Sequence, residues 1–239
     1  MKIVAIGDIQ GRSVWKLIVE QEKDADKVVF IGDYFDSRDV FTAEEQMQNF
    51  KEIVHYKKDH PEKEVILLIG NHDHQYLQCV KEHNTSGYQK LAAPAIQQLI
   101  EENVDQLQMC YRHEDLLFSH AGIGHSWLKD HGWKEEQDIS SFVNDQFKYK
   151  PLSFCFFGFD PYGDDTIQTP IWIRPRSLLR DCHDTLRKQY IQIVGHTGMT
   201  KIDVDGKATG GRYFFIDTLG TSGEYLKWED GIFSVGKTK

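Results

Sequence analysis

Cysteine and proline are both scarce in this chain of 239 residues, which contains four cysteines and six prolines. The cysteines, at positions 79, 110, 155 and 182, include no pair with C-x-x-C spacing. That distribution argues against a zinc knuckle and against a redox motif of paired thiols. We therefore expect reduced thiols in a cytoplasmic protein.

Long apolar runs are absent as well. No run reaches the roughly 18 residues that a membrane helix needs, and the first residues lack the features of a signal peptide. We therefore expect no membrane segment. The chain also has no internal repeat, low-complexity tract or long flexible linker, and 40% of its residues are hydrophobic. A single domain over residues 1–239 is the simplest prediction.

Positive charge is in deficit, because 28 lysines and arginines stand against 37 aspartates and glutamates, for a formal net charge of −9. A protein of this sign is poorly suited to bind a nucleic-acid backbone, whose affinity for proteins depends on basic side chains. We expect no duplex nucleic acid among its partners.

A repeated pattern is present at the start of the chain. The apolar residues 1–6 are followed at once by Gly7 and Asp8. Residues 27–31 lead in the same way to Gly32 and Asp33, and residues 64–69 lead to Gly70 and Asn71. Each short apolar run that ends in glycine predicts a buried strand, and ligands of open α/β sheets bind at the carboxyl ends of the strands.

Two later runs continue the pattern with histidine. Residues 116–119 precede His120, and residues 190–195 precede His196. Five strand ends would then bring polar side chains to one edge of the fold, namely Asp8, Asp33, Asn71, His120 and His196. Carboxylates, an amide oxygen and imidazoles in one place predict a metal site.

These residues also carry a family resemblance. The segments Gly7–Gly11 (GDIQG), Gly32–Arg38 (GDYFDSR), Gly70–Asp73 (GNHD), His120–Gly122 (HAG) and Gly195–Thr197 (GHT) resemble the motifs of the calcineurin-like metallophosphoesterases. Their order, with GHT last, is similar to the serine/threonine phosphatase branch, particularly its small bacterial and bacteriophage members. The resemblance extends from position 8 to about position 217. It implies an α/β fold in which two packed mixed sheets are flanked by helices, an αββα sandwich.

The resemblance implies two divalent metal ions. Asp33 would bridge them, Asp8 and Gln10 would complete the first position, and the second would be completed by Asn71, His120 and His196. Two such ions, roughly 3.5–4 Å apart, clamp a phosphoryl group and acidify a bridging water into a nucleophile. Manganese is the expected metal, with magnesium, iron, zinc and nickel as alternatives. Bound cations would also reverse the local field, so the negative net charge does not exclude a phosphorylated substrate.

The resemblance assigns four further residues to catalysis. His72 would be the general acid beside the leaving group, and Asp36 would hydrogen-bond it and keep it protonated. Arg174 matches a Trp-x-Arg segment whose arginine binds phosphate oxygens. Arg38 would do the same from the other side, although the family usually has arginine at the position of Ser37.

A second departure concerns Gln10, which stands where the family has a metal-binding histidine. An amide oxygen is a harder and weaker ligand than imidazole, which favours manganese or magnesium over zinc or iron at the first position. Alternatively, Gln10 points away or donates its amide to a ligand carboxylate.

The local patterns predict several elements. Thr42 and Glu45 fit the capping box of a helix, and further helices are expected over residues 72–83 and 177–190. The last strands, over 213–217, 223–229 and 232–235, have the pattern of a β-meander. The segment at about 123–170 is the least regular. Its aromatic part, 154–163, is either a loop tucked against the core or a lid or specificity insertion over the site.

Three functions remain open. The first is a metal-dependent phosphomonoester hydrolase resembling a serine/threonine protein phosphatase, acting on a phosphorylated protein, a peptide or a small phosphoester. The second is a hydrolase of dinucleoside polyphosphates, nucleotides or cyclic nucleotides. The third, suggested by Gln10, is a non-catalytic protein that binds phosphorylated ligands through a degraded metal site.

Overall fold

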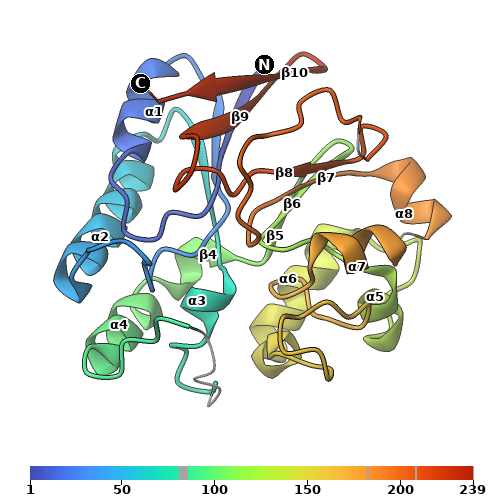
Figure 1. Ribbon diagram of the computed structural model, residues 1–239, viewed down its shortest axis with the longest axis horizontal. Helices are drawn as coiled ribbons and strands as arrows, with labels where there is room; N and C mark the ends of the chain where they lie inside the picture. Colours follow the sequence, from blue (N-terminus) through green and yellow to red (C-terminus); the bar gives the residue numbers. More distant parts are fainter. Residues whose placement is uncertain (81–85, 182, 208, 239) are drawn as a thin grey trace.

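Two β-sheets form the middle of the protein, and helices flank them (Figure 1). The computed structural model describes residues 1–80, 86–181, 183–207 and 209–238. The larger sheet has six strands in the order β10-β9-β1-β2-β3-β4, and the smaller has four in the order β5-β6-β7-β8. The predicted architecture of two mixed sheets between helices is confirmed.

The larger sheet is parallel at its centre and antiparallel at one side. Its parallel strands are β1 (Lys2–Ile6), β2 (Lys27–Phe30), β3 (Glu64–Leu68) and β4 (Leu107–Gln108). The antiparallel pair is β9 (Glu224–Glu229) and β10 (Ile232–Lys237), and β9 pairs with β1 through Ile3 and Trp228. The first and last parts of the chain therefore lie side by side (Figure 1).

The smaller sheet combines a hairpin with two parallel strands. Its strands are β5 (Cys110–His113), β6 (Leu116–Ser119), β7 (Ile191–Val194) and β8 (Tyr213–Phe215). The predicted C-terminal meander is wrong, because β8 pairs in parallel with β7 and only β9 and β10 form a hairpin. Strand β9 instead pairs with β1, on the side of β1 that does not pair with β2.

The helices divide between the two sheets. On the side of the larger sheet lie α1 (Trp15–Gln21), α2 (Ala43–Asp59) and α4 (Ala93–Glu101) (Figure 1). On the side of the smaller sheet lie α5 (His125–Asp130), α6 (Ile139–Tyr149), α7 (Pro175–Arg180) and α8 (Asp184–Gln189). Short 3-10 helices cover Val104–Gln106 and Pro151–Phe154. The predicted capping box of α2 is confirmed, with Thr42 N–H bonded to Glu45 at 2.7 Å and Glu45 N–H to Thr42 at 3.1 Å.

Two predicted helices are shorter than expected. The helix expected over 72–83 is only α3 (Asn71–His74). Beyond it, the N–H groups of Tyr76, Leu77 and Val80 bond to carbonyls three residues back, which is the spacing of successive turns, and residues 81–85 lie outside the described part. The helix expected over 177–190 is split into α7 and α8, with Cys182 between them likewise outside the described residues.

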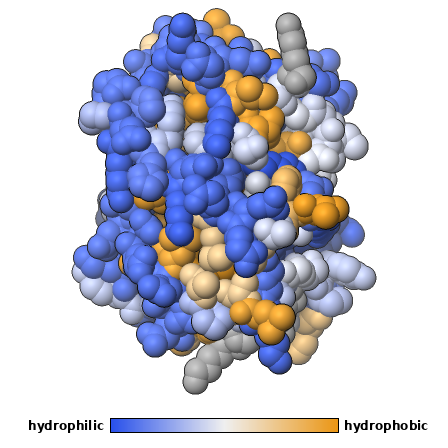
Figure 2. Space-filling model, turned by 90° about the vertical axis from the view of Figure 1, so that its left-hand side faces the viewer, coloured by the Kyte–Doolittle hydropathy of each residue, from blue (hydrophilic) through white to orange (hydrophobic). Residues whose placement is uncertain are grey.

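Alternation along the strands creates two cores. Ile3 and Ala5 of β1 point between the sheets, together with Val29 and Phe118. Val4, the residue between them, faces the helices. The central strands are thus buried on both faces, and the polar residues of these segments lie beyond the strand ends. Figure 2 shows the side of α1 and α2, where hydrophilic groups predominate. Among the described residues, no helix has the length and apolar composition needed to cross a bilayer.

Candidate metal centre

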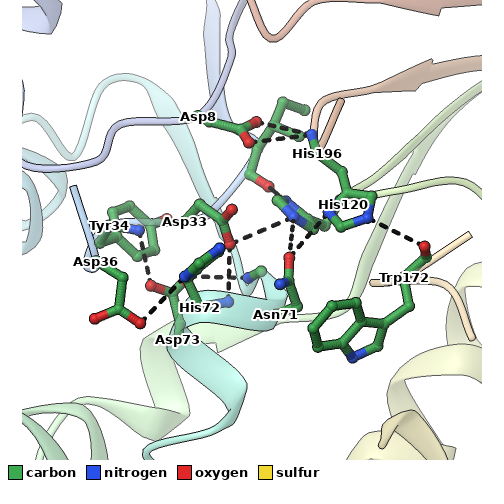
Figure 3. Close-up of polar contacts among 12 residues, drawn as sticks. Asp8, Asp33, Tyr34, Asp36, Asn71, His72, Asp73, His120, Trp172 and His196 are labelled. Atoms are coloured by element: carbon green, nitrogen blue, oxygen red, sulfur yellow. Dashed lines mark hydrogen bonds and ion pairs between the residues drawn. The ribbon is translucent and has the colours of Figure 1, made fainter. Parts of the chain in front are cut away.

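The strand ends converge as predicted. Asp8, Asp33 and Asn71 follow β1, β2 and β3, and His120 and His196 follow β6 and β7. Side chains that follow strands of both sheets gather in one place (Figure 3). Asp8 and His120 are fully buried, and Asp33 and Asn71 are no more than 2% exposed.

The residues expected at the second metal position lie close together. Single ligand atoms of Asp33, His120 and His196 lie within 4.8 Å of one another. The Asn71 Oδ1 atom is 3.0 Å from both His120 Nε2 and His196 Nδ1 (Figure 3). The remaining ring nitrogens donate to backbone carbonyls, His120 Nδ1 to Ile31 at 2.9 Å and His196 Nε2 to Trp172 at 3.1 Å. These bonds fix both rings and their tautomers.

The His120 and His196 rings are in the neutral form that a metal ligand requires. Burial lowers the pKa of His120, and burial together with the Arg174 charge lowers the pKa of His196 well below its usual range. Each ring is therefore neutral and has already donated its only N–H. The nitrogens that face Asn71 Oδ1 are lone-pair acceptors, as is that oxygen, so no proton lies between them. Acceptor atoms in such close contact, completed by the Asp33 carboxylate, are the donor set that a divalent metal requires.

The backbone is strained at this centre. Gln10, Asp33, Asp36 and His196 all have positive φ, between 44° and 65°. Left-handed backbone is costly for residues with a side chain and persists where surrounding bonds impose it. Here the N–H of Gln10 bonds to the carbonyl of Asp33 at 2.6 Å, which ties the two loops together. The strain thus aims side chains from separate strands at one point.

Two glycines give the carboxylates room. A Cβ on Gly70 would overlap the Asp33 carboxylate, and one on Gly195 would overlap the Asp8 carboxylate. This close approach explains the glycines just before Asn71 and His196.

The residues expected at the first metal position are arranged differently. Both carboxylate oxygens of Asp8 accept from the N–H of His196, at 3.0 and 3.1 Å. The Gln10 Oε1 atom faces Arg12, whose two terminal nitrogens are each 3.4 Å away. Arg12 is itself held by Asp39 at 2.8 Å. The amide oxygen that would replace an imidazole therefore already accepts from a guanidinium.

Asp217 is a site residue that the sequence analysis missed. It lines the same cavity as Gln10 and Asp33. After burial, the charge of Asp217 contributes most to the raised pKa of Asp8. Burial and the neighbouring Asp33 raise the pKa of Asp217 to about 6. The signal was present, since Asp217 follows β8 as Asp8 follows β1, but without a glycine before it.

The predicted acid and its partner are in contact. His72 Nδ1 is 3.1 Å from Asp36, and the N–H of His72 bonds to Asp33 at 3.0 Å (Figure 3). Burial lowers the pKa of His72, but the carboxylates of Asp33 and Asp36 outweigh it, so the net shift is upward. Asp36 also accepts from the Tyr76 hydroxyl at 2.5 Å and from Gln89 at 3.2 Å. Neither support was predicted, because Tyr76 falls in the segment expected to be a helix over 72–83 and Gln89 lies beyond that segment.

A cavity of about 600 Å³ opens in front of these residues, and both predicted arginines line it. Arg174 is held by the Tyr162 carbonyl at 2.6 Å and the Thr197 hydroxyl at 3.1 Å. Within the described part of the chain, no hydrogen bond or ion pair engages the guanidinium of Arg38. The guanidinium of Arg38 is therefore less constrained than that of Arg174. Arg38 lines the cavity although it lies one position after the usual arginine of the family.

Comparisons with known proteins agree with this geometry. No curated protein sequence matches the chain. The crystal structure of a cold-active protein-tyrosine phosphatase from the psychrophile Shewanella sp. superposes with a TM-score of 0.70 at 18% identity, covering 99% of this chain and 77% of that one. A single-residue mutant of a cold-active protein tyrosine phosphatase gives a TM-score of 0.61 at 20% identity over the same shares. These likenesses establish the fold.

The sequence itself establishes the family. The model of the calcineurin-like phosphoesterases matches residues 1–220, which include every strand end described above. With the buried group of Asp33, His120 and His196, the match indicates divalent metal binding. This chain belongs to the calcineurin-like phosphoesterase family.

Proposed function

We propose that the protein is a metal-dependent phosphomonoester hydrolase, with water as the nucleophile and two divalent ions, manganese being the expected metal. The observation that carries the proposal is the contact of Asn71 Oδ1 with two neutral imidazole nitrogens, beside the His72–Asp36 pair. Divalent ions bound there would supply Lewis-acid polarisation of the phosphoryl oxygens and activation of water.

The protein's own groups account for phosphate binding. Arg38 and Arg174 line the cavity that faces the metal ligands. A guanidinium donates through a planar fork that matches two phosphoryl oxygens, and its charge offsets that of the dianion. Arg174 is already oriented by Tyr162 and Thr197, and Arg38 is free to adjust to the substrate.

His72 supplies the proton for the leaving group in this proposal. Asp36 holds Nδ1–H of the ring, which leaves Nε2–H of the imidazolium to face the cavity that His72 lines. The neighbouring carboxylates raise the pKa of His72, which favours the protonated ring. An alkoxide leaves slowly without a proton, so this role matters most for phosphoserine-like substrates.

The proposed substrates are phosphorylated proteins, peptides or small phosphoesters. The test is hydrolysis of para-nitrophenyl phosphate by metal-stripped protein, before and after manganese is added, with His196→Ala as the control for contaminating activity. We expect turnover only with metal and only in the wild type. Metal-independent turnover, or none with any divalent ion, would refute the proposal, and the latter result would favour a non-catalytic binding protein.

Phosphopeptides and diadenosine tetraphosphate separate the substrate classes. A higher kcat/KM for the phosphopeptides supports the phosphatase assignment. A higher kcat/KM for diadenosine tetraphosphate, a nucleotide or a cyclic nucleotide assigns the protein to the second class of hydrolase instead.

A further inference from the structure

Three aromatic side chains project into solvent from one short segment, residues 156–163, which we call the aromatic loop. Phe157 is 61% exposed, Phe159 102% and Tyr162 77%. Large aromatic side chains are usually buried, and an exposed group of them marks an interaction site. Among the described residues, the one other aromatic side chain of comparable exposure is Tyr149 at 69%, which stands alone on α6.

The aromatic loop is attached to the catalytic cavity. Its carbonyl at Tyr162 accepts from Arg174 at 2.6 Å, and Tyr162 and Pro161 line the cavity. A Cβ on Gly163 would be 2.9 Å from the carbonyl of Trp172, so the loop packs closely on that residue. The same Trp172 carbonyl orients His196 of the metal centre. The loop is thus a wall of the site.

Polar groups, and not the exposed rings, determine the shape of the loop. The Asp160 carboxylate accepts from the N–H groups of Tyr162 at 2.8 Å and Asp164 at 3.1 Å. The amide side chain of Gln168 bonds to both the N–H and the carbonyl of Phe157. The rings of Phe157 and Phe159 are therefore not needed to hold the loop and remain available for contact with another molecule.

The size of the cavity bears on what that molecule is. About 600 Å³ is far more than a phosphate group occupies and lies in the range of sites that enclose a larger ligand. With the phosphate near Asn71 and Arg38, the remainder of a substrate can extend past Tyr162 toward the exposed rings.

The separation of the rings favours several small contacts over one large one. Among the described residues, no ring–ring contact joins Phe157, Phe159 or Tyr162, so each ring is a separate apolar group on the loop. The loop turns between them, with the N–H of Gly163 bonded to the carbonyl of Asp160 at 3.0 Å. Three separate apolar contacts suit the successive side chains of a polypeptide.

We propose that the aromatic loop binds apolar side chains that flank the phosphorylated residue of a polypeptide substrate. The inference rests on the proposed function and specifies its substrate class. Phe157 and Phe159 would supply the contact beyond the cavity, and the link from Tyr162 to Arg174 would place the phosphorylated residue at the metal centre.

The test compares a double variant, Phe157→Ala with Phe159→Ala, with wild type and with Tyr149→Ala as a matched exposed-aromatic control. The substrates are two phosphoserine peptides of equal length and charge, one flanked by leucines and the other by serines, and para-nitrophenyl phosphate. Burial of one aromatic side chain changes binding by about tenfold or more. We expect the double variant to lose at least about tenfold in kcat/KM on the leucine peptide, mainly through KM, and under about twofold on the other substrates.

Each other outcome counts against the inference. An equal loss on all three substrates means that the loop only supports Arg174, and a loss no larger than that of Tyr149→Ala means that the rings bind nothing. With diadenosine tetraphosphate as a fourth substrate, a selective loss on that compound identifies base stacking instead. If wild type hydrolyses para-nitrophenyl phosphate but neither peptide, this inference fails and the proposed function stands. If it hydrolyses none of them with metal, the proposed function itself fails.

Discussion

The two metal positions that we propose share Asp33 but differ in what surrounds it. At the second position, Asn71, His120 and His196 already place their lone pairs in mutual contact. At the first position, the Asp8 carboxylate accepts from the backbone N–H of His196, and the oxygen of Gln10 accepts from a guanidinium.

The difference shows that neighbouring positions in one site can be organised to different degrees. At the second position, acceptor atoms of Asn71, His120 and His196 face one another, an arrangement that a bound cation would stabilise. The first has an alternative cation, since the charge of Arg12 lowers the pKa of both Asp8 and Asp217 against the effect of burial. We therefore propose that the second position binds its metal tightly and the first binds loosely.

His196→Ala should have the largest effect, because it removes a ligand of the second position. Metals contribute several kcal/mol to phosphoryl transfer, and about 1.4 kcal/mol corresponds to tenfold in rate, so we expect turnover to fall by about 10⁴-fold. Metal content measured by elemental analysis should fall with it. Retention of full metal content and activity would show that the second position is not where we place it.

His72→Ala should lower turnover by roughly 10²–10⁴-fold while metal content stays near that of wild type, since His72 acts as an acid and not as a ligand. The loss should be much smaller for para-nitrophenyl phosphate, whose leaving group needs little protonation, than for an alkyl phosphate. Equal losses on the two substrates would mean that another group donates the proton.

Acid should destabilise the folded protein through His74, which lies on α3 with Asn71 and donates to the Pro151 carbonyl at 2.9 Å. Burial lowers the pKa of His74 to about 4. The folded state therefore resists protonation, and stability present above pH 6.5 is lost as pH falls toward 4, by about 3 kcal/mol. In His74→Gln the denaturant-measured stability should depend less on pH across this window. The exposed His55→Gln is the control, and an identical pH dependence in wild type and His74→Gln would contradict the account.

Gln10→His should have the smallest effect and act on the loose position alone. An imidazole accepts less readily from Arg12 and binds transition metals better than an amide oxygen, so we expect manganese affinity there to rise about tenfold. Arg12→Lys keeps the positive charge but removes the two guanidinium nitrogens that contact Gln10. This variant therefore distinguishes the effect of the hydrogen bonds from repulsion between the charge of residue 12 and the metal. Coinciding titration curves for wild type and Gln10→His would mean that residue 10 stays outside the coordination sphere.

The sequence predicted what depends on local pattern. A short apolar run, a glycine and a polar residue occupy consecutive positions, so Asp8, Asp33 and Asn71 could be placed at strand ends without knowledge of the fold. The two sheets followed from the family resemblance. His72 and Asp36 were likewise paired through the resemblance, and the structure brings them into contact.

What escaped prediction depends on distant contacts. Whether Gln10 faces a metal or Arg12 is decided by Asp39, which holds Arg12, and by Gly220, where a Cβ would come within 2.6 Å of that guanidinium. Asp217 joins the site because β8 pairs with β7 instead of with β9, a choice that the alternation of residues in the strand does not reveal.

Calorimetric titration of metal-stripped protein with manganese tests the central claim most directly. Wild type should show one tight and one looser class of site, His120→Ala should remove the tight class, and Asp8→Asn should remove only the loose one. Two classes of equal affinity in the wild type, or loss of the tight class in Asp8→Asn, would contradict the proposed asymmetry between the two positions.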